Sequence, residues 1–129
     1  MDIYFNSGKQ VFADIDGFTV KTDQQPRAGG NGGYPQPFSL FLASLGACAG
    51  IYVKNFCDQR NISTDKVRLT QEVEYDREKR RISVVRLRIY VPADFPEKYE
   101  GAVIQAAGLC PVKRHLHEDI GMDVQVIRK

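Results

Sequence analysis

Cys110 is followed by Pro111, and this pair has the clearest chemical meaning in the chain. Proline suits the first position of a helix, where its missing N–H group would have had no partner, so the cysteine is predicted to lie at the helix cap. Free N–H groups and the positive end of the helix dipole stabilise a thiolate there, so we expect a lowered pKa for Cys110. A cysteine that only caps or packs the helix is the alternative that the local sequence leaves open.

The two remaining cysteines, Cys48 and Cys57, lie in one long apolar segment. Cys48 is flanked on each side by an alanine and a glycine, so another group could approach it closely. A cysteine in such a segment is commonly an inert apolar side chain, and only a pairing with Cys110 makes Cys48 a candidate nucleophile. Along a helix Cys57 would lie half a turn round from Cys48 and ~13 Å further on, so we interpret Cys57 as structural.

The two histidines, His115 and His117, lack the i, i+4 spacing with which helical histidines chelate zinc. A zinc site made of Cys48, Cys110 and one histidine stays open as a weaker alternative, and it would require stoichiometric zinc in the purified protein. We expect no metal and no cofactor.

Length and charge limit the class of protein. The chain has 129 residues, of which 43% are apolar and 26% charged, as expected of one globular domain spanning residues 1–129. Its 18 basic and 16 acidic residues nearly balance, so no nucleic-acid partner is expected. Three cysteines do not make a paired disulfide framework, and redox chemistry is therefore expected to be catalytic or absent.

Two apolar patterns bear on location. Met1 to Ser7 lacks a basic stretch followed by an apolar one, so we expect no secretory signal and a cytoplasmic protein. Phe38 to Val53 falls short of the ~20 residues of a membrane span, so no membrane association is expected. A buried core helix explains this segment better.

The N-terminal half predicts three parts. Residues 2–23 alternate apolar and polar residues between Ser-Gly and Asp-Gly pairs, which indicates a three-strand meander. Residues 24–37 hold four glycines and three prolines and predict a long mobile loop. A helix is expected from Phe38 to Arg60, apolar on nearly all sides of its first four turns and ended by Asn61, so that it passes through the core.

The C-terminal half predicts a hairpin, two helices and a closing strand. Residues 67–75 and 82–91 alternate and are rich in β-branched residues, as in a β-hairpin. A helix is expected from Pro96 to about Gly108, and a second from Pro111 to near Gly121. Residues 122–127 then form the last strand.

Two motifs, PFSLFLASLGACAG at 37–50 and GLCPVKRHL at 108–116, together with this order of elements, resemble the OsmC/Ohr family. The family comprises peroxide-reducing enzymes and their relatives in osmotic and hydroperoxide stress, and the resemblance covers the whole chain. It implies an α+β fold, in which the strand meander and the later hairpin surround a long buried central helix. It also implies an intertwined homodimer with its sites at the subunit interface.

The resemblance implies a thiol peroxidase. Cys48 would attack the O–O bond of a small organic hydroperoxide and become a sulfenic acid, and Cys110 would resolve it as a disulfide. An unidentified external dithiol would then reduce the disulfide, which the cytosolic redox poise permits because it is transient.

The chain departs from the family pattern at the residues that hold the peroxidatic thiolate. Active members use an arginine and a glutamate, whereas Phe38 stands at the glutamate position and the arginine position falls near Lys9 and Gln10. Arg27, in the glycine-rich loop, is the nearest stand-in. Without a cation near Cys48, burial would raise the pKa of that thiol and slow its attack.

Phe38 also favours an alternative from another class. A non-enzymatic relative could bind a small hydrophobic ligand between the apolar helix and the glycine-rich loop as part of a stress response. Peroxide-dependent disulfide formation would distinguish the two hypotheses.

Overall fold

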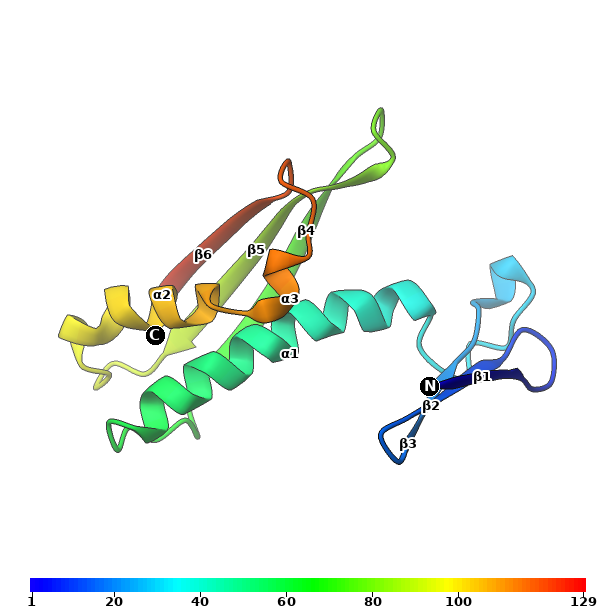
Figure 1. The fold of residues 1–129 in the computed structure, drawn as a ribbon. Coiled ribbons are helices and arrows are strands. Elements are labelled where there is room, and N and C mark those ends of the chain that lie inside the picture. Colours follow the sequence, from blue (N-terminus) through cyan, green and yellow to red (C-terminus); the bar gives the residue numbers. More distant parts are fainter. The chain divides into compact units, whose positions relative to one another are not determined.

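The computed structural model describes residues 1–129, which form two compact units, Met1–Ala43 and Ser44–Lys129. The mixed α+β class is confirmed, whereas the single domain spanning both units stays a prediction. Along the chain (Figure 1) the elements are β1 (Asp2–Phe5), β2 (Val11–Ile15), β3 (Phe18–Thr22), the 3-10 turn η1 (Pro26–Ala28), α1 (Pro37–Asp58), β4 (Arg68–Asp76), β5 (Arg81–Val91), the 3-10 turn η2 (Glu97–Tyr99), α2 (Glu100–Gly108), α3 (Pro111–Arg114) and β6 (Gly121–Arg128).

The first unit holds the predicted meander, in which β2 pairs antiparallel with both β1 and β3. Alternate side chains of a strand point to opposite faces, and on one face the ring of Phe12 meets Tyr4 and Tyr34 edge to face. Lys21 lies over the rings of Phe12 and Tyr34. Three short strands and a small aromatic cluster thus shape this unit.

A buried carboxylate organises the glycine-rich loop that follows β3. Asp23 is 1% exposed and accepts backbone N–H groups from Gln24, Asn31 and Gly33 at 2.7, 3.3 and 3.1 Å. Burial alone would raise the pKa of Asp23, but these hydrogen bonds and one from the Gln10 side chain together lower it. The loop that was expected to be mobile is therefore held by backbone hydrogen bonds to the buried carboxylate of Asp23.

Gly30 is the position at which this loop tolerates no side chain. A Cβ atom added there would lie 2.0 Å from the carbonyl oxygen of Gln24 and 2.7 Å from a carboxylate oxygen of Asp23. We expect Gly30→Ala to lower the free energy of unfolding by about 1–3 kcal/mol, because backbone must move to admit the methyl group. Urea denaturation measures this effect.

Gly101→Ala is the matched control for this substitution. Nothing lies within 4 Å of the added methyl group in α2, so the helix should gain about 0.5–1 kcal/mol. An equal response of the two variants would contradict the assigned clash at Gly30.

The long helix α1 begins at Pro37, as its missing N–H group favours, and ends at Asp58. Asn61 adopts a left-handed conformation with φ of 54°, which confirms it as the stop. The helix was expected to be buried nearly all round, but only one stripe is buried, comprising Leu45, Ala49, Val53, Phe56 and Cys57. The physical reason is that one three-stranded sheet covers one side of a helix, and Ile51 on another side is 61% exposed.

By length and composition α1 meets the requirement for crossing a membrane, a test that the core helix of a soluble protein also passes. The apolar run considered in the sequence ends at Val53, whereas the helix extends over 22 residues.

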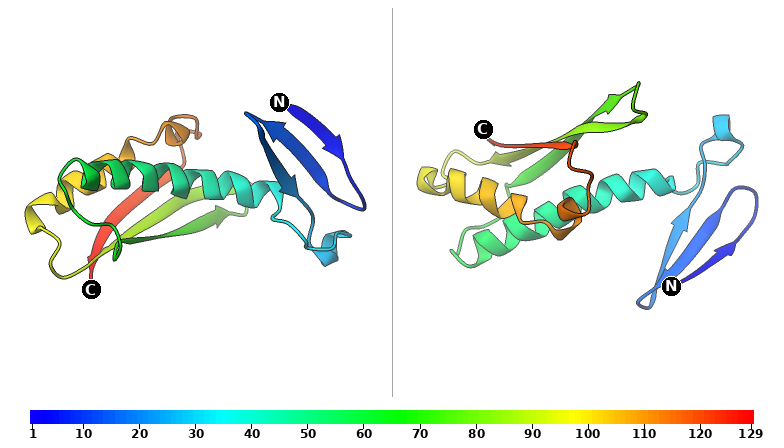
Figure 2. Two further views of the ribbon diagram at one scale, coloured as in Figure 1. Left: turned by 90° about the horizontal axis from the view of Figure 1, so that it is seen from below. Right: turned by 45° about the horizontal axis from the view of Figure 1, so that its top comes forward.

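The second unit contains a three-stranded sheet with β5 at its centre. The hairpin of β4 and β5 is confirmed as antiparallel, and β6 pairs with β5 in parallel. α2 and the part of α1 in this unit lie on the same face of the sheet (Figure 2). Their side chains form the core with that face, which includes Val53, Leu87, Ile89, Val103 and Ala107.

The opposite face of this sheet is charged, as expected when strand residues alternate between core and solvent. Arg88 pairs with Asp123 at 3.0 Å, and Arg86 pairs with Glu74 and with Asp123. These pairs are partly exposed to solvent, so each contributes only modestly to stability. The alternation fixes which face of β5 packs on the helices.

The helical region after β5 is shorter than predicted. Residues 97–108 form η2 and α2, close to the expected helix. The helix expected from Pro111 to near Gly121 is wrong beyond Arg114, because α3 is a single turn and the next residues form turns. His115 and His117 therefore do not lie in a last helical turn.

Candidate functional site

The thiols of Cys48 and Cys110 meet within the second unit. Cys48 lies near the middle of α1 and is partly exposed, and Cys110 lies at the N-cap of α3 and is 2% exposed. A hydrogen bond joins the two thiol side chains. Both cysteines are free, so the structure describes the reduced pair.

Local sequence explains where each sulfur lies. Pro111 occupies the first turn of α3 and leaves Cys110 as the cap, with φ of −50° and ψ of 119°. The backbone N–H groups of Val112 and Lys113 face the Cys110 sulfur, although neither makes a full capping hydrogen bond. On α1, Cys48 adjoins the buried stripe at Leu45 and Ala49.

The expectation that the pKa of Cys110 is lowered is wrong. Burial raises the pKa of this thiol first, the hydrogen bond with Cys48 raises it further, and the N–H groups of Val112 and Lys113 offset these effects only in part. Cys110 thus stays protonated at neutral pH. The raised pKa favours the folded state below the ordinary pKa of a thiol, and this contribution is lost as the pH rises through the raised value.

Cys57 lies apart from this pair. It is fully buried in the core among Val53, Phe56 and Leu87. Burial raises its pKa, helped by Asp58. These surroundings fit the structural role expected for it.

A side chain from β4 uses one of the small residues near Cys48. A Cβ atom added to Gly46 would lie 3.1 Å from Oε1 of Gln71, so this glycine admits the buried amide side chain. Nothing lies within 4 Å of a Cβ atom added to Gly50. The close approach expected beside Cys48 is therefore made by Gln71 on one side and leaves the other side open.

A hollow between α1 and α2 lies beyond Cys48 towards the C-terminal end of α1, and we call it the α1–α2 groove; neither Cys48 nor Cys110 lines it. Its volume is about 300 Å³. Cys48, Tyr52 and Asn55 fall within about 60° of arc on α1, so the groove follows the face of the thiol. The lining residues are Tyr52, Asn55, Phe56, Gln59, Arg60, Ala106 and Leu109.

This groove was not predicted from the sequence, and the i, i+4, i+7 spacing of Cys48, Tyr52 and Asn55 is the signal that could have indicated it. α2 runs antiparallel to α1, because the ring of Tyr99 packs edge to face on Phe56 while Cys110, beyond the other end of α2, contacts Cys48. The groove therefore begins near the thiol pair, with Tyr52 one turn beyond Cys48 and Leu109 next to Cys110 in the sequence.

Arg27 lies in η1 of the first unit, on the loop that Asp23 organises, and is exposed. It belongs to a different unit from the two thiols, so its role as the cation for Cys48 stays a prediction. Phe38, also in the first unit, is 54% exposed and stacks on Phe41 with ring centroids 5.7 Å apart.

The zinc alternative has no geometric support. No group of three or more histidine, cysteine, aspartate or glutamate residues is placed to hold a metal ion. Cys48 and Cys110 together supply only two ligands, and structural zinc takes four.

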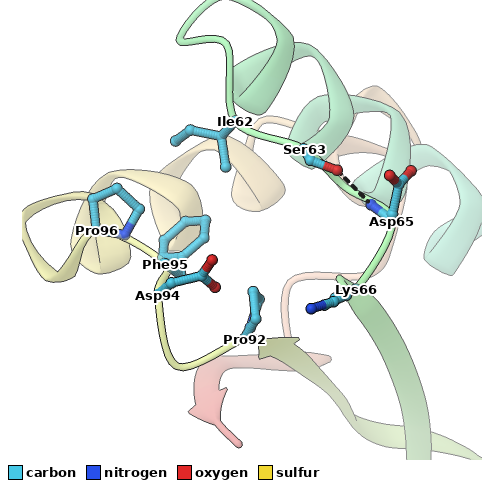
Figure 3. A pocket seen from close by; sticks show the side chains of 8 residues that line it. All are labelled: Ile62, Ser63, Asp65, Lys66, Pro92, Asp94, Phe95 and Pro96. Atoms are coloured by element: carbon cyan, nitrogen blue, oxygen red, sulfur yellow. Dashed lines mark hydrogen bonds between the residues drawn. The ribbon is translucent and has the colours of Figure 1, made fainter.

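A second pocket lies at the C-terminal end of α1, between the loop after that helix and the loop after β5 (Figure 3). Its volume is about 250 Å³. Ser63 accepts a hydrogen bond from the backbone N–H of Asp65 at 3.2 Å, and Asp94 and Lys66 add further charges to the wall. The pocket includes no thiol, so it is separate from the cysteine pair.

Comparison with known proteins places this geometry in a family. The family model described as OsmC-like protein matches residues 29–125, whereas no curated protein sequence matches the chain. Three solved structures that resemble it come from Psychrobacter arcticus 273-4, Mycoplasma pneumoniae and Legionella pneumophila.

The P. arcticus protein, assigned to the osmotic stress induced and detoxification response, is 20% identical with a TM-score of 0.82, and the match covers 98% of this chain and 93% of that one. The OsmC like protein from M. pneumoniae is 15% identical with a TM-score of 0.78 and coverages of 98% and 94%. The organic hydroperoxide resistance protein OsmC from L. pneumophila is 21% identical with a TM-score of 0.67 and coverages of 97% and 93%.

These likenesses confirm the OsmC/Ohr fold expected from the two cysteine motifs. With the family model matching most of its length, the chain belongs to the OsmC-like protein family.

Proposed function

We propose that this protein reduces small organic hydroperoxides with Cys48 as the attacking thiol and Cys110 as the resolving thiol. The contact between these two thiols is the observation that carries the proposal. Two cysteines so far apart in the sequence are brought into contact only by the fold, and such contact is what a disulfide between them requires. The resemblance to a protein named for organic hydroperoxide resistance supports the same class of substrate.

Exposure and protonation support this division of roles. Cys48 is the more accessible sulfur, which suits the thiol that meets the peroxide. Cys110 is buried and has a raised pKa, so it remains a thiol that can donate a hydrogen bond to a Cys48 thiolate.

The proposed cycle has three steps, in which atoms and electrons balance. The Cys48 thiolate attacks the terminal oxygen of ROOH, the O–O bond breaks, and the departing alkoxide takes a proton to leave as ROH. The sulfenic acid on Cys48 is then attacked by the sulfur of Cys110, which gives a disulfide and water. An external dithiol reduces the disulfide by exchange and is itself oxidised to a disulfide.

Arg27 is the cation that we propose for holding the thiolate and orienting the peroxide. The backbone of the loop that carries it is held by the hydrogen bonds to Asp23, which limits where the guanidinium can lie. This matters because Phe38 stands where active members of the family have a glutamate.

We further propose that the protein works as a homodimer in the cytoplasm. Large apolar side chains are exposed on the single chain, and Ile3, Phe5, Phe18 and Ile51 are each more than 60% exposed. Dimerisation would remove this surface from water. A cytoplasmic location suits a disulfide that must be reduced in every cycle.

A second candidate is a non-enzymatic protein that binds a small hydrophobic ligand. Phe38 in place of the glutamate favours it, and the α1–α2 groove offers a partly apolar wall. The two candidates differ in what peroxide does to the thiols.

One equivalent of tert-butyl hydroperoxide is expected to convert the reduced protein to an intramolecular disulfide between Cys48 and Cys110. Intact-mass spectrometry would show the loss of two hydrogen atoms, and peptide mapping would place the disulfide, with Cys57 remaining a free thiol. Dithiothreitol should reverse the change. A protein that keeps three free thiols after this treatment would exclude the peroxidase and favour the binding protein.

A further inference from the structure

We propose that the reduced pair of Cys48 and Cys110 binds one Cu(I) ion between its two sulfurs. The inference goes beyond the reduction of hydroperoxides, because it assigns a second kind of ligand to the same thiols. It rests on the proposed function only in its consequence, which is that a bound ion blocks the reaction with peroxide.

The number of ligands selects the metal. The fold brings two thiols into contact, and no group of three or more histidine, cysteine, aspartate or glutamate residues is placed to hold a metal ion. Two thiolates are too few for structural zinc, which takes four ligands, and they are the wrong donors for magnesium or calcium, which bind oxygen. Cu(I) is a soft ion that prefers sulfur and is stable with two thiolates in a line. The pair therefore fits Cu(I) better than these divalent ions.

The surroundings of Cys110 suit a sulfur that carries negative charge. The backbone N–H groups of Val112 and Lys113 face this sulfur, and such donors favour the thiolate over the thiol. Groups that hydrogen-bond to a metal ligand also orient it and raise the affinity of the site. Cys110 is 2% exposed, so little water reaches this side of the pair.

An ion can enter the site from the side of Cys48. This cysteine is partly exposed, and nothing lies within 4 Å of a Cβ atom added to Gly50, two residues further along α1. Leu45 and Ala49, which adjoin Cys48 in the buried stripe, offer no competing ligand. Cys57 is fully buried in the core and stays outside the site.

Binding of Cu(I) changes no oxidation state. The ion replaces the protons of both thiols, the two protons pass to solvent, and the complex of Cu(I) with two thiolates carries one net negative charge. The lone pair with which Cys48 would attack a peroxide is then donated to the metal. Cu(I) and the hydroperoxide thus compete for the reduced protein.

Anaerobic titration of the reduced protein with Cu(I), in competition with the coloured chelator bicinchoninate, measures affinity and stoichiometry. We expect one Cu(I) per chain and two sulfur ligands in X-ray absorption spectra. Cys48→Ser and Cys110→Ser should each weaken binding at least about a hundredfold, because losing a group that only supports a metal ligand already costs about 10–100-fold.

Cys57→Ala is the matched control and should keep the affinity of the wild type. Should a serine variant fail to fold, the wild type still decides, because bound Cu(I) should shield both Cys48 and Cys110 from alkylation by iodoacetamide. One Cu(I) per two chains, more than two sulfur ligands, or full affinity in folded Cys110→Ser would overturn the inference.

The outcomes separate this inference from the proposed function. Binding of Cu(I) by both thiols without any peroxide-driven disulfide would support the metal site and exclude the peroxidase. A peroxide-driven disulfide in a protein that binds no Cu(I) would support the peroxidase and exclude the metal site.

Ag(I) tests the competition, because it has the same charge, is similarly soft and is not oxidised by hydroperoxides. One equivalent of Ag(I) should prevent tert-butyl hydroperoxide from forming the disulfide between Cys48 and Cys110. A disulfide that forms at the same rate with Ag(I) present would contradict the block.

Discussion

Replacing Cys48 with serine is expected to lower the rate of organic hydroperoxide reduction by at least about a thousandfold, because the reaction loses its nucleophile. A serine hydroxyl does not ionise at neutral pH and does not form the sulfenic acid of the proposed cycle. Consumption of tert-butyl hydroperoxide in the presence of dithiothreitol measures the effect. The variant should keep its fold, since Cys48 is only partly buried.

Variants of the other two cysteines serve as a control and as a second test of this prediction. Cys57→Ala should keep the peroxidase rate, since Cys57 is buried in the core and lies apart from the thiol pair. Cys110→Ser should still react once with peroxide but accumulate the sulfenic acid and then the sulfinic acid on Cys48. Normal turnover by Cys48→Ser would rule out this residue as the nucleophile.

Leu87→Ala is expected to cause the largest loss of stability, about 2–5 kcal/mol in the free energy of unfolding. Leu87 is fully buried on β5, the central strand of the second sheet, and packs in the cluster that includes α1 and α2. Natural domains have about 5–15 kcal/mol in total, so this single change removes a large fraction. Urea denaturation followed by far-UV circular dichroism measures it.

Leu109→Ala makes the same chemical change at a leucine that is 55% exposed, and it should cost much less than Leu87→Ala. Equal losses from the two variants would mean that β5 does not form the centre of the core.

The parts of the fold with a strong local signal could be predicted from the sequence. The strand meander, the hairpin, the start of α1 at Pro37 and its stop at Asn61 all follow from alternation, proline and residues that tolerate a left-handed conformation. The placement of Cys110 at a helix cap followed from Pro111 in the same way.

Features that depend on tertiary packing could not be predicted. The sequence of neither strand alone indicates that β6 pairs with β5 in parallel. The cap at Cys110 indicated a lowered pKa, but the burial and the Cys48 contact that raise it come from residues distant in the sequence. For the same reason the burial of α1 on a single side depends on how much sheet covers it.

The candidate site was predictable only in part. The family motifs identified Cys48 and Cys110. No motif includes Arg60, because its stacking on Phe56 and Tyr99 results from tertiary packing. Gln71, which approaches Gly46 next to the thiol, is likewise an ordinary polar residue of a strand when seen in the sequence.

The crossover from β5 to its parallel neighbour β6 has a consequence for biosynthesis, because Cys110 lies inside that connection. A ribosome that adds ~5–20 residues per second needs roughly 3–12 s to pass from Cys48 to Cys110. During this interval the first sulfur leaves the exit tunnel with no second sulfur to restore it. If Cys110 resolves Cys48 as proposed, a nascent chain under oxidant exposure is open to irreversible oxidation at Cys48, whereas the finished chain has Cys110 in place to form the disulfide.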